Sequence, residues 1–110
     1  MYHVTLLYGH PQDPAAFEEY YYQKHLPLAA KISGVKGFTL SKLESGDPHQ
    51  SAPYYRTASL YFDSREACQT VLATPEAQAA VADLQNFATG GVTVVEGEEE
   101  VLVPVSLASA

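Results

Sequence analysis

The sequence predicts an α+β domain in which helices cover one face of a four-stranded antiparallel sheet. Three observations lead to this prediction. Segments with strand and helix periodicity follow one another in the order β–α–β–β–α(α)–β, the ferredoxin-like pattern. The strand candidates alternate between two kinds of side chain, as strands do when helices cover only one face of a sheet. The chain contains no linker or repeat, so we expect residues 1–110 to form a single domain.

The first strand and the first helix occupy the first third of the chain. Tyr2–Tyr8 alternates, which predicts a strand. Asp13 and Pro14 supply an N-cap followed by proline at the first helical position. We expect this helix to end near Ser33-Gly34. At 100° per residue, its buried face would consist of Phe17, Tyr21, Lys24, Leu28 and Ile32.

Three further segments have strand character. Gly37–Leu43 and Tyr54–Phe62 both alternate, and the composition of residues 44–53, "ESGDPHQSAP", predicts a loop between them. Val92–Val105 is rich in β-formers but is interrupted by glutamates, so it forms either one bent strand or two.

Two helices are predicted between the third and fourth strands. The segment "DSRE" has the spacing of a capping box, with Asp63 as the cap and Glu66 reaching back to it. Thr74 and Pro75 open another helix as cap and first residue, and Gly90-Gly91 would close it.

The face of the sheet opposite the helices carries almost no charge. A partly apolar, uncharged sheet face is suited to a subunit contact, so we expect a homodimer in which two sheets pack face to face. The alternative is a face that is merely solvated. The residues predicted to line it are His3, Thr5, Leu7, Thr39, Ser41, Leu43, Tyr55, Thr57, Ser59 and Tyr61.

Composition excludes several classes of partner. The formal net charge of −7 repels phosphate groups, so we expect neither nucleic acid nor an anionic membrane surface as a partner. No apolar run approaches the roughly 20 residues of a membrane span, and the N-terminus lacks the features of a signal peptide. Cys68 is the single cysteine, which rules out an internal disulfide and fits a cytoplasmic location.

The segment "FEEYYYQKHLPLAAKISGV" combines three tyrosines, a histidine and a proline within a predicted helix. Pro27 cannot donate to the carbonyl of Gln23, so the helix should bend or break near Gln23–Leu26. Tyr21 and His25 are four residues apart and share a face, with His25 at the edge of the apolar stripe. An imidazole there can exchange a proton near neutral pH, although a packing role alone would explain the same residues.

This segment closely resembles the signature of EthD-type proteins: an aromatic pair, Lys-His-x-Pro-Leu and Gly-x-x-Gly-aromatic. The stretch "YYRTASLYFDSREACQTVLATPEAQAAVADLQNF" is similar to the second half of the same family. The resemblance implies a dimeric α/β-barrel with a site between the helices and the sheet of each subunit. Similar folds host heme-degrading monooxygenases, cofactor-free monooxygenases and muconolactone isomerases.

The leading functional hypothesis is an enzyme or accessory protein for a small molecule. His25 would be the catalytic acid or base, acting in oxygenation, isomerisation or dehydration of an aromatic or polyketide-like compound. Tyr21, Tyr22 and Arg56 would bind the ligand, although Arg56 can instead pair with Glu18 or Glu19. The alternatives are a non-catalytic small-molecule binder or accessory protein of an oxygenase system, and a structural dimer without a pocket.

No cofactor or metal site is expected from the sequence. The histidines are scattered, and no metal-ligand spacing of histidine or cysteine occurs. Heme is a weaker option because axial ligation needs an exposed imidazole and a roomy pocket. Cys68 has little basic surrounding and is expected in the core rather than as a nucleophile.

Overall fold

The sheet contains the four predicted strands in the predicted topology. The computed structural model describes residues 1–105. The strands β1 (Tyr2–Tyr8), β2 (Gly37–Lys42), β3 (Arg56–Phe62) and β4 (Val92–Glu98) form one antiparallel sheet in the order β2-β3-β1-β4. The described residues beyond Glu98 add no second strand, so the C-terminal stretch forms one strand.

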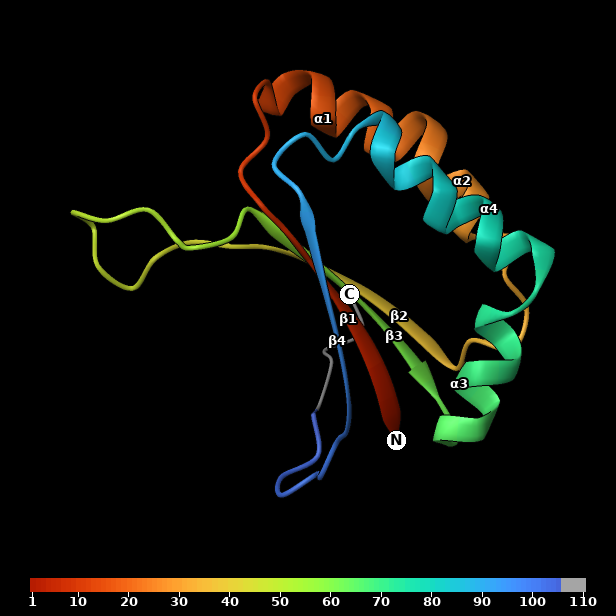
Figure 1. The fold of residues 1–110 in the computed structure, drawn as a ribbon. Coiled ribbons are helices and arrows are strands. Elements are labelled where there is room, and N and C mark those ends of the chain that lie inside the picture. Colours follow the sequence, from red (N-terminus) through yellow and green to blue (C-terminus); the bar gives the residue numbers. More distant parts are fainter. Residues whose placement is uncertain (106–110) are drawn as a thin grey trace.

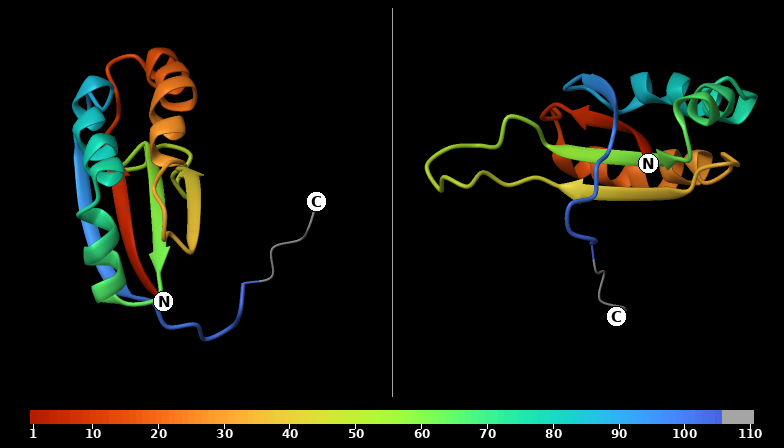
Figure 2. Two further views of the ribbon diagram at one scale, coloured as in Figure 1. Left: turned by 90° about the vertical axis from the view of Figure 1, so that its right-hand side faces the viewer. Right: turned by 90° about the horizontal axis from the view of Figure 1, so that it is seen from below.

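All helices of the described chain lie on one face of the sheet, and the other face is uncovered (Figure 1). The first helical row consists of α1 (Pro14–Tyr20), the π-helix η1 (Tyr21–His25) and α2 (Leu26–Ala29). The second row, beside it in Figure 2, consists of α3 (Arg65–Leu72), α4 (Pro75–Asp83) and the 3₁₀ turn η2 (Leu84–Asn86). The predicted α+β fold is confirmed. None of these helices is long and apolar enough to cross a membrane.

The alternation along the strands decides which side chains the helices cover. Across β1 and β3, Val4 pairs with Leu60 and Tyr8 with Arg56, and all four are buried beneath the helices. The residues that alternate with this set, Thr5 and Leu7 in β1 and Thr57 and Ser59 in β3, point to the uncovered face and are only partly buried. The predicted assignment of the two faces is therefore confirmed for β1 and β3, including Arg56 on the helical side. It is wrong for Tyr55, which precedes β3 and packs its ring against Phe17 of α1, 5.2 Å between centroids, instead of lining the uncovered face.

Side chains cap three helices, two of them as predicted. Asp13 and Thr74 each accept a hydrogen bond from the backbone N–H three residues later. The predicted cap at Asp63 is wrong. The hydroxyl of Ser64 accepts the N–H of the third residue after it at 3.0 Å, while Asp63 lies 3.7 Å from Lys36. The backbone at Ser64 is still extended, so the helix begins one residue later than the capping-box spacing suggested.

Both helical rows end earlier than predicted. α2 ends at Ala29 rather than near Ser33-Gly34. The N–H groups of Lys31 and Ile32 donate to carbonyls only three residues back, each at 3.1 Å, and these bonds tighten the turn. Gly34, with φ of 89°, then redirects the chain. α4 ends at Asp83 rather than at Gly90-Gly91, which leaves the Asp83 side chain at the end of the helix.

The predicted irregularity before Pro27 is a π-turn. Tyr21–His25 is π-helical, and the N–H of Leu26 donates to the carbonyl of Tyr21, five residues back. A π-turn accommodates one extra residue within a helix. Pro27 follows this turn, where the helix returns to α-helical register. Because Pro27 has no N–H, no backbone donor is left without a partner at this position. The helix is thus irregular at the predicted place, but it continues rather than breaks.

The π-turn changes which residues the first helical row buries. The predicted stripe contained Lys24 and Leu28, but Lys24 is exposed and Leu28 only partly buried. One extra residue in a turn rotates everything after it by about 100° relative to a regular helix. His25, expected at the edge of the stripe, is therefore fully part of it. The buried positions are every fourth residue: Phe17, Tyr21, His25 and Ala29.

Candidate functional site

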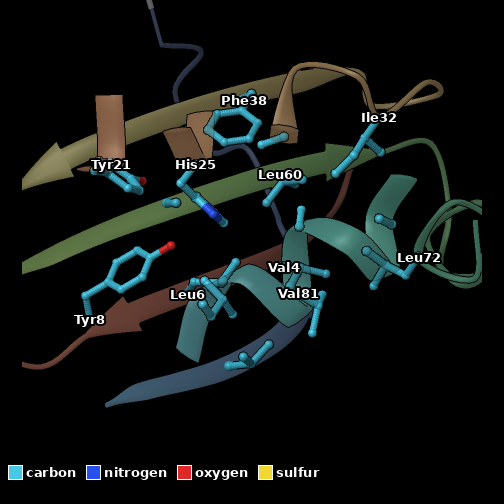
Figure 3. Close-up of a pocket in the computed structure, with 16 residues that line it drawn as sticks. Val4, Leu6, Tyr8, Tyr21, His25, Ile32, Phe38, Leu60, Leu72 and Val81 are labelled. Carbon is cyan, nitrogen blue, oxygen red and sulfur yellow. The ribbon is translucent and has the colours of Figure 1, made fainter. Parts of the chain in front are cut away.

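The core beneath the helices forms two apolar clusters, and a pocket borders both of them. One cluster includes Phe62 of β3 and Cys68 of α3, and the other includes Tyr8 of β1 and Phe17 of α1. A pocket of about 130 Å³ takes lining residues from both clusters, with others from α2 and α4 (Figure 3). Its wall is almost entirely apolar.

A groove at the edge of the sheet lies next to the pocket. This groove of about 440 Å³ runs along α2 and β2 and shares Ala29, Ile32 and Phe38 with the pocket. Phe38 is 39 % exposed, so its ring forms part of the outer surface as well as of the wall.

His25 reaches the pocket from the π-turn and is held from three sides. It is 5 % exposed, and its ring is stacked on Tyr21 with centroids 5.7 Å apart and planes 11° apart. The ring of Phe87 lies 4.6 Å from it. Its Nδ1 lies 3.0 Å from Oδ2 of Asp83, at the end of α4. The ring is therefore fixed in orientation by packing and by one hydrogen bond.

Asp83 is ionised and accepts three hydrogen bonds. The Tyr20 hydroxyl and the Asn86 amide donate to its Oδ1 at 2.7 and 2.9 Å, and His25 Nδ1 donates to its Oδ2. Burial alone would raise the pKa of the Asp83 carboxyl, but the hydrogen bonds from Asn86, Tyr20 and His25 outweigh it, and the pKa is lowered. A carboxylate can only accept, so Nδ1 carries the proton.

The second nitrogen of the ring, Nε2, is the one that remains available to a bound molecule. In a neutral imidazole protonated at Nδ1, Nε2 has a free lone pair. No side chain or backbone group of residues 1–105 forms a hydrogen bond with it. Figure 3 shows the nitrogen-bearing edge of the His25 ring pointing into the pocket. The arrangement can accept a proton from a bound molecule and return it.

Two buried tyrosines lie at the same end of the pocket. Tyr8 and Tyr21 are 1 % and 0 % exposed, and their rings meet edge to face with centroids 5.6 Å apart. Burial raises the pKa of Tyr8, and it raises the pKa of Tyr21 to about 12, so both stay protonated at neutral pH. Each hydroxyl influences the pKa of the other, but they do not meet in hydrogen-bond geometry. The Tyr21 hydroxyl is left without a partner among the described residues.

Arg56 is held behind Tyr21 and does not line the pocket. Its Nε and Nη2 donate to the two carboxylate oxygens of Glu18 at 2.9 and 2.6 Å, and Nη2 also donates to the Tyr22 hydroxyl at 3.1 Å. Its guanidinium lies 5.5 Å from the ring centroid of Tyr21 and 5.4 Å from that of Tyr22. Of the partners considered from the sequence, the structure therefore provides Glu18.

The three consecutive tyrosines have three different environments. Tyr20 is partly buried and holds Asp83, whereas Tyr21 is fully buried and lines the pocket. Tyr22 is 50 % exposed and meets Arg56. Successive positions on a helix point about 100° apart, so one of the three had to lie at the surface.

The structure brings together part of the predicted site and adds two residues to it. His25 and Tyr21 line the pocket, whereas Tyr22 and Arg56 lie outside it. Tyr8 and Asp83 were not among the predicted site residues. For Tyr8 a signal was available, because the alternation of β1 places it on the helical side. For Asp83 the sequence offered no signal, because Asp83 lies 58 residues from His25 in the chain.

Neither a metal nor heme suits the residues around the pocket. No group of three or more His, Cys, Asp or Glu side chains in residues 1–105 is placed to hold a metal ion. The pocket is well below the 300 Å³ or so at which sites for drug-sized ligands begin, so it does not fit a heme. Cys68 is fully buried in the core, as predicted, and burial raises the pKa of its thiol.

Comparison with known proteins gives a consistent family assignment. Residues 9–91 match the sequence model of the EthD domain. A relative from Rhodococcus erythropolis, described as an uncharacterized 11.0 kDa protein in the thcB-thcC intergenic region, is 46 % identical over 104 residues. The matched segment covers 94 % of this chain and 100 % of the relative.

Solved structures share the fold. An ethyl tert-butyl ether d (EthD) family protein from Bacillus halodurans superimposes with a TM-score of 0.83 and 32 % identity, covering 91 % of this chain and 99 % of that protein. A dimeric ferredoxin-like protein of unknown function from Thermobifida fusca gives a TM-score of 0.62 at 14 % identity, covering 87 % of each chain. The second similarity concerns the fold alone.

Proposed function

The chain belongs to the EthD family, as its Lys-His-x-Pro-Leu segment predicted, and we propose that it is a small-molecule enzyme with His25 as general acid or base. One observation carries the proposal. An ionised Asp83 holds Nδ1 of His25, and Nε2 has no protein partner where the ring meets an apolar pocket. A carboxylate that orients an imidazole through one nitrogen leaves the other free to move a proton.

The reactions that this arrangement favours all begin or end with a proton transfer. Isomerisation and dehydration remove a proton from the substrate, and oxygenation without a cofactor begins with deprotonation. Tyr8 and Tyr21 keep their protons and can stabilise negative charge that develops on a substrate oxygen. An aromatic compound of one ring suits the pocket volume, whereas a polyketide-like compound of several rings exceeds it. Ligand binding by Tyr22 and Arg56 stays a prediction, since both lie outside the pocket.

A second candidate function is a non-catalytic binder or accessory protein of an oxygenase system. The observation in its favour is the wall of the pocket, which is apolar except at one end and would hold a ring without any chemistry. The two candidates differ only in whether His25 changes the bound molecule.

Replacement of His25 by Asn separates the two candidates. The Asn side-chain amide takes the place of Nδ1 and can still donate to Asp83, but nothing replaces Nε2. Cyclohexanone is a suitable probe because base catalysis exchanges its α-hydrogens in D₂O. We expect the wild type to accelerate this exchange, as followed by NMR, and His25→Asn to bind the ketone without accelerating it. Equal binding with no exchange by either protein would favour the accessory binder.

We also propose that two copies associate through the uncovered sheet face. None of the ten residues predicted to line this face is charged, and the hydroxyls of Thr5 and Ser59 already bond to each other at 2.9 Å. The chain after β4 adds apolar surface, because it extends away from the body (Figure 2) with Val101, Leu102 and Val103 exposed.

A further inference from the structure

The pocket has a polar end and an apolar end. Figure 3 shows Tyr8, Tyr21 and His25 at one end, and Ile32, Leu72 and Val81 at the other. A molecule that fits such a pocket has an apolar body and a single polar group, because a second polar group at the apolar end would be buried without a partner.

The bound molecule must be uncharged. No Asp, Glu, Lys or Arg lines the pocket. The two nearest charges are already matched, since Arg56 is paired with Glu18 behind Tyr21, and Asp83 is saturated by three donors behind His25. A carboxylate or an amine buried in this pocket would therefore lose its hydration without gaining an ionic partner.

A polar group that can both donate and accept a hydrogen bond satisfies this end of the pocket best. In the neutral ring, whose one proton faces Asp83, Nε2 accepts a hydrogen bond but does not donate one. At the same end of the pocket, the hydroxyl of Tyr21 is completely buried and has no partner within the described residues. The Tyr8 hydroxyl points into the same space (Figure 3). A hydroxyl group of the ligand satisfies both protein groups, because it donates to Nε2 of His25 and accepts from a tyrosine hydroxyl.

The volume limits the apolar body to one ring. The enclosed space is about 130 Å³. An apolar protein cavity of about 150 Å³ takes up benzene, so the two volumes are of the same order. A larger substituent would exceed this volume.

We propose that the ligand of this pocket is an uncharged compound of one ring that carries a single hydroxyl group, as phenol does. The hydroxyl donates to Nε2 of His25 and accepts from Tyr8 or Tyr21, and the ring lies against the apolar wall. This inference rests on the proposed function, because it assigns a ligand class to the same site.

Three compounds of similar size test the proposal by isothermal titration calorimetry. Phenol carries the hydroxyl, toluene replaces it by a methyl group, and benzoate replaces it by a charge. We expect phenol to bind at least roughly tenfold more tightly than toluene, because toluene leaves the polar end of the pocket without a hydrogen-bonding partner, and benzoate not to bind. Binding should be measured on the full-length protein at neutral pH.

Two variants locate the hydroxyl within the pocket. At least one of Tyr21→Phe and Tyr8→Phe should weaken phenol binding roughly three- to tenfold, and both should leave toluene binding unchanged. Tyr2→Phe is the matched control: it removes a hydroxyl from the same face of the sheet, where Tyr2 donates to Glu96 at 2.7 Å outside the pocket. It should leave phenol binding unchanged.

The outcomes that overturn the ligand class differ from those that overturn the site. Equal binding of phenol and toluene, or tighter binding of benzoate, would refute the hydroxyl compound but leave a functional pocket. Phenol binding that is unchanged in both pocket variants would show that the hydroxyl lies elsewhere and would also refute the inference. No binding of any of the three compounds would refute both the ligand class and the pocket as a binding site.

Discussion

The charge on Asp83 determines which nitrogen of His25 carries the proton. Tyr20 and Asn86 both donate to Oδ1, so in an Asp83→Asn variant the amide oxygen should occupy that position and the NH₂ group should face Nδ1. Nδ1 would then accept a hydrogen bond, and the proton would move to Nε2. NMR of ¹⁵N-labelled histidine should show Nδ1–H in the wild type and Nε2–H in the variant. Stability should fall by about 1–3 kcal/mol, because a charge-assisted hydrogen bond is lost.

Asp63→Asn is the control for this prediction, since the Asp63 side chain is 66 % exposed and contacts Lys36 rather than His25. It should change neither the tautomer nor, to within about 0.5 kcal/mol, the free energy of unfolding. An Nε2–H tautomer in the wild type would contradict the orientation of the whole Asp83–His25 pair.

The ion pair of Glu18 and Arg56 should make stability depend on pH in the acid range. The hydrogen bond from Arg56 lowers the pKa of Glu18 below its ordinary value of 4.5. Because the folded-state pKa is the lower one, the pair stabilises the fold above about pH 4.5, and this contribution disappears as pH falls through the folded-state pKa. Urea unfolding should show that the free energy of unfolding falls less between about pH 6 and pH 3 for Glu18→Gln than for the wild type. The exposed neighbour offers a control, Glu19→Gln, which should follow the wild type.

At the scale of the element, the π-turn is what brings His25 to the pocket. In Pro27→Ala, residue 27 regains an N–H and can donate to the carbonyl of Gln23, so regular α-helix can replace the π-turn. The new hydrogen bond stabilises the folded state by about 0.5–1.5 kcal/mol, and the greater freedom of the unfolded chain destabilises it by about 0.4–1 kcal/mol, so the two effects nearly cancel. We therefore expect little change in global stability, a protected amide at residue 27 in hydrogen exchange, and loss of phenol binding.

Pro14→Ala is the matched control, because Pro14 is at the first position of α1, where an N–H has no intrahelical partner. It should leave phenol binding unchanged. A Pro27→Ala variant that retains the π-turn and binds phenol normally would show that tertiary packing, and not the proline, maintains the π-turn.

At the scale of the molecule, the uncovered sheet face predicts a homodimer. Light scattering after gel filtration should give twice the chain mass of 11.9 kDa. Ser59→Asp should yield a monomer, because it would bury an unpaired carboxylate between the two sheets. The control Gln69→Glu adds the same charge on the exposed side of α3 and should stay dimeric. A wild-type monomer at micromolar concentration would refute the dimer.

Features that depend on neighbouring residues could be predicted from the sequence. The alternation along β1 and β3 assigned their faces, and the caps Asp13 and Thr74 were recognised, because each is a pattern within a few residues. The irregularity before Pro27 was also predicted, since a missing N–H affects the helix wherever the chain folds. These local rules were enough for the fold class and for naming His25 as a candidate.

Only the tertiary structure decided what His25 can do. Helical periodicity assumes 3.6 residues per turn, so it placed Lys24 in the buried stripe, and the π-turn moved His25 and Ala29 into that position instead. The carboxylate that orients His25 comes from the end of the second helical row, 58 residues away. Such a contact arises when two helices pack on one sheet. No spacing of residues along the chain predicts this contact, because it is stabilised by packing between distant elements rather than by interactions between neighbouring residues.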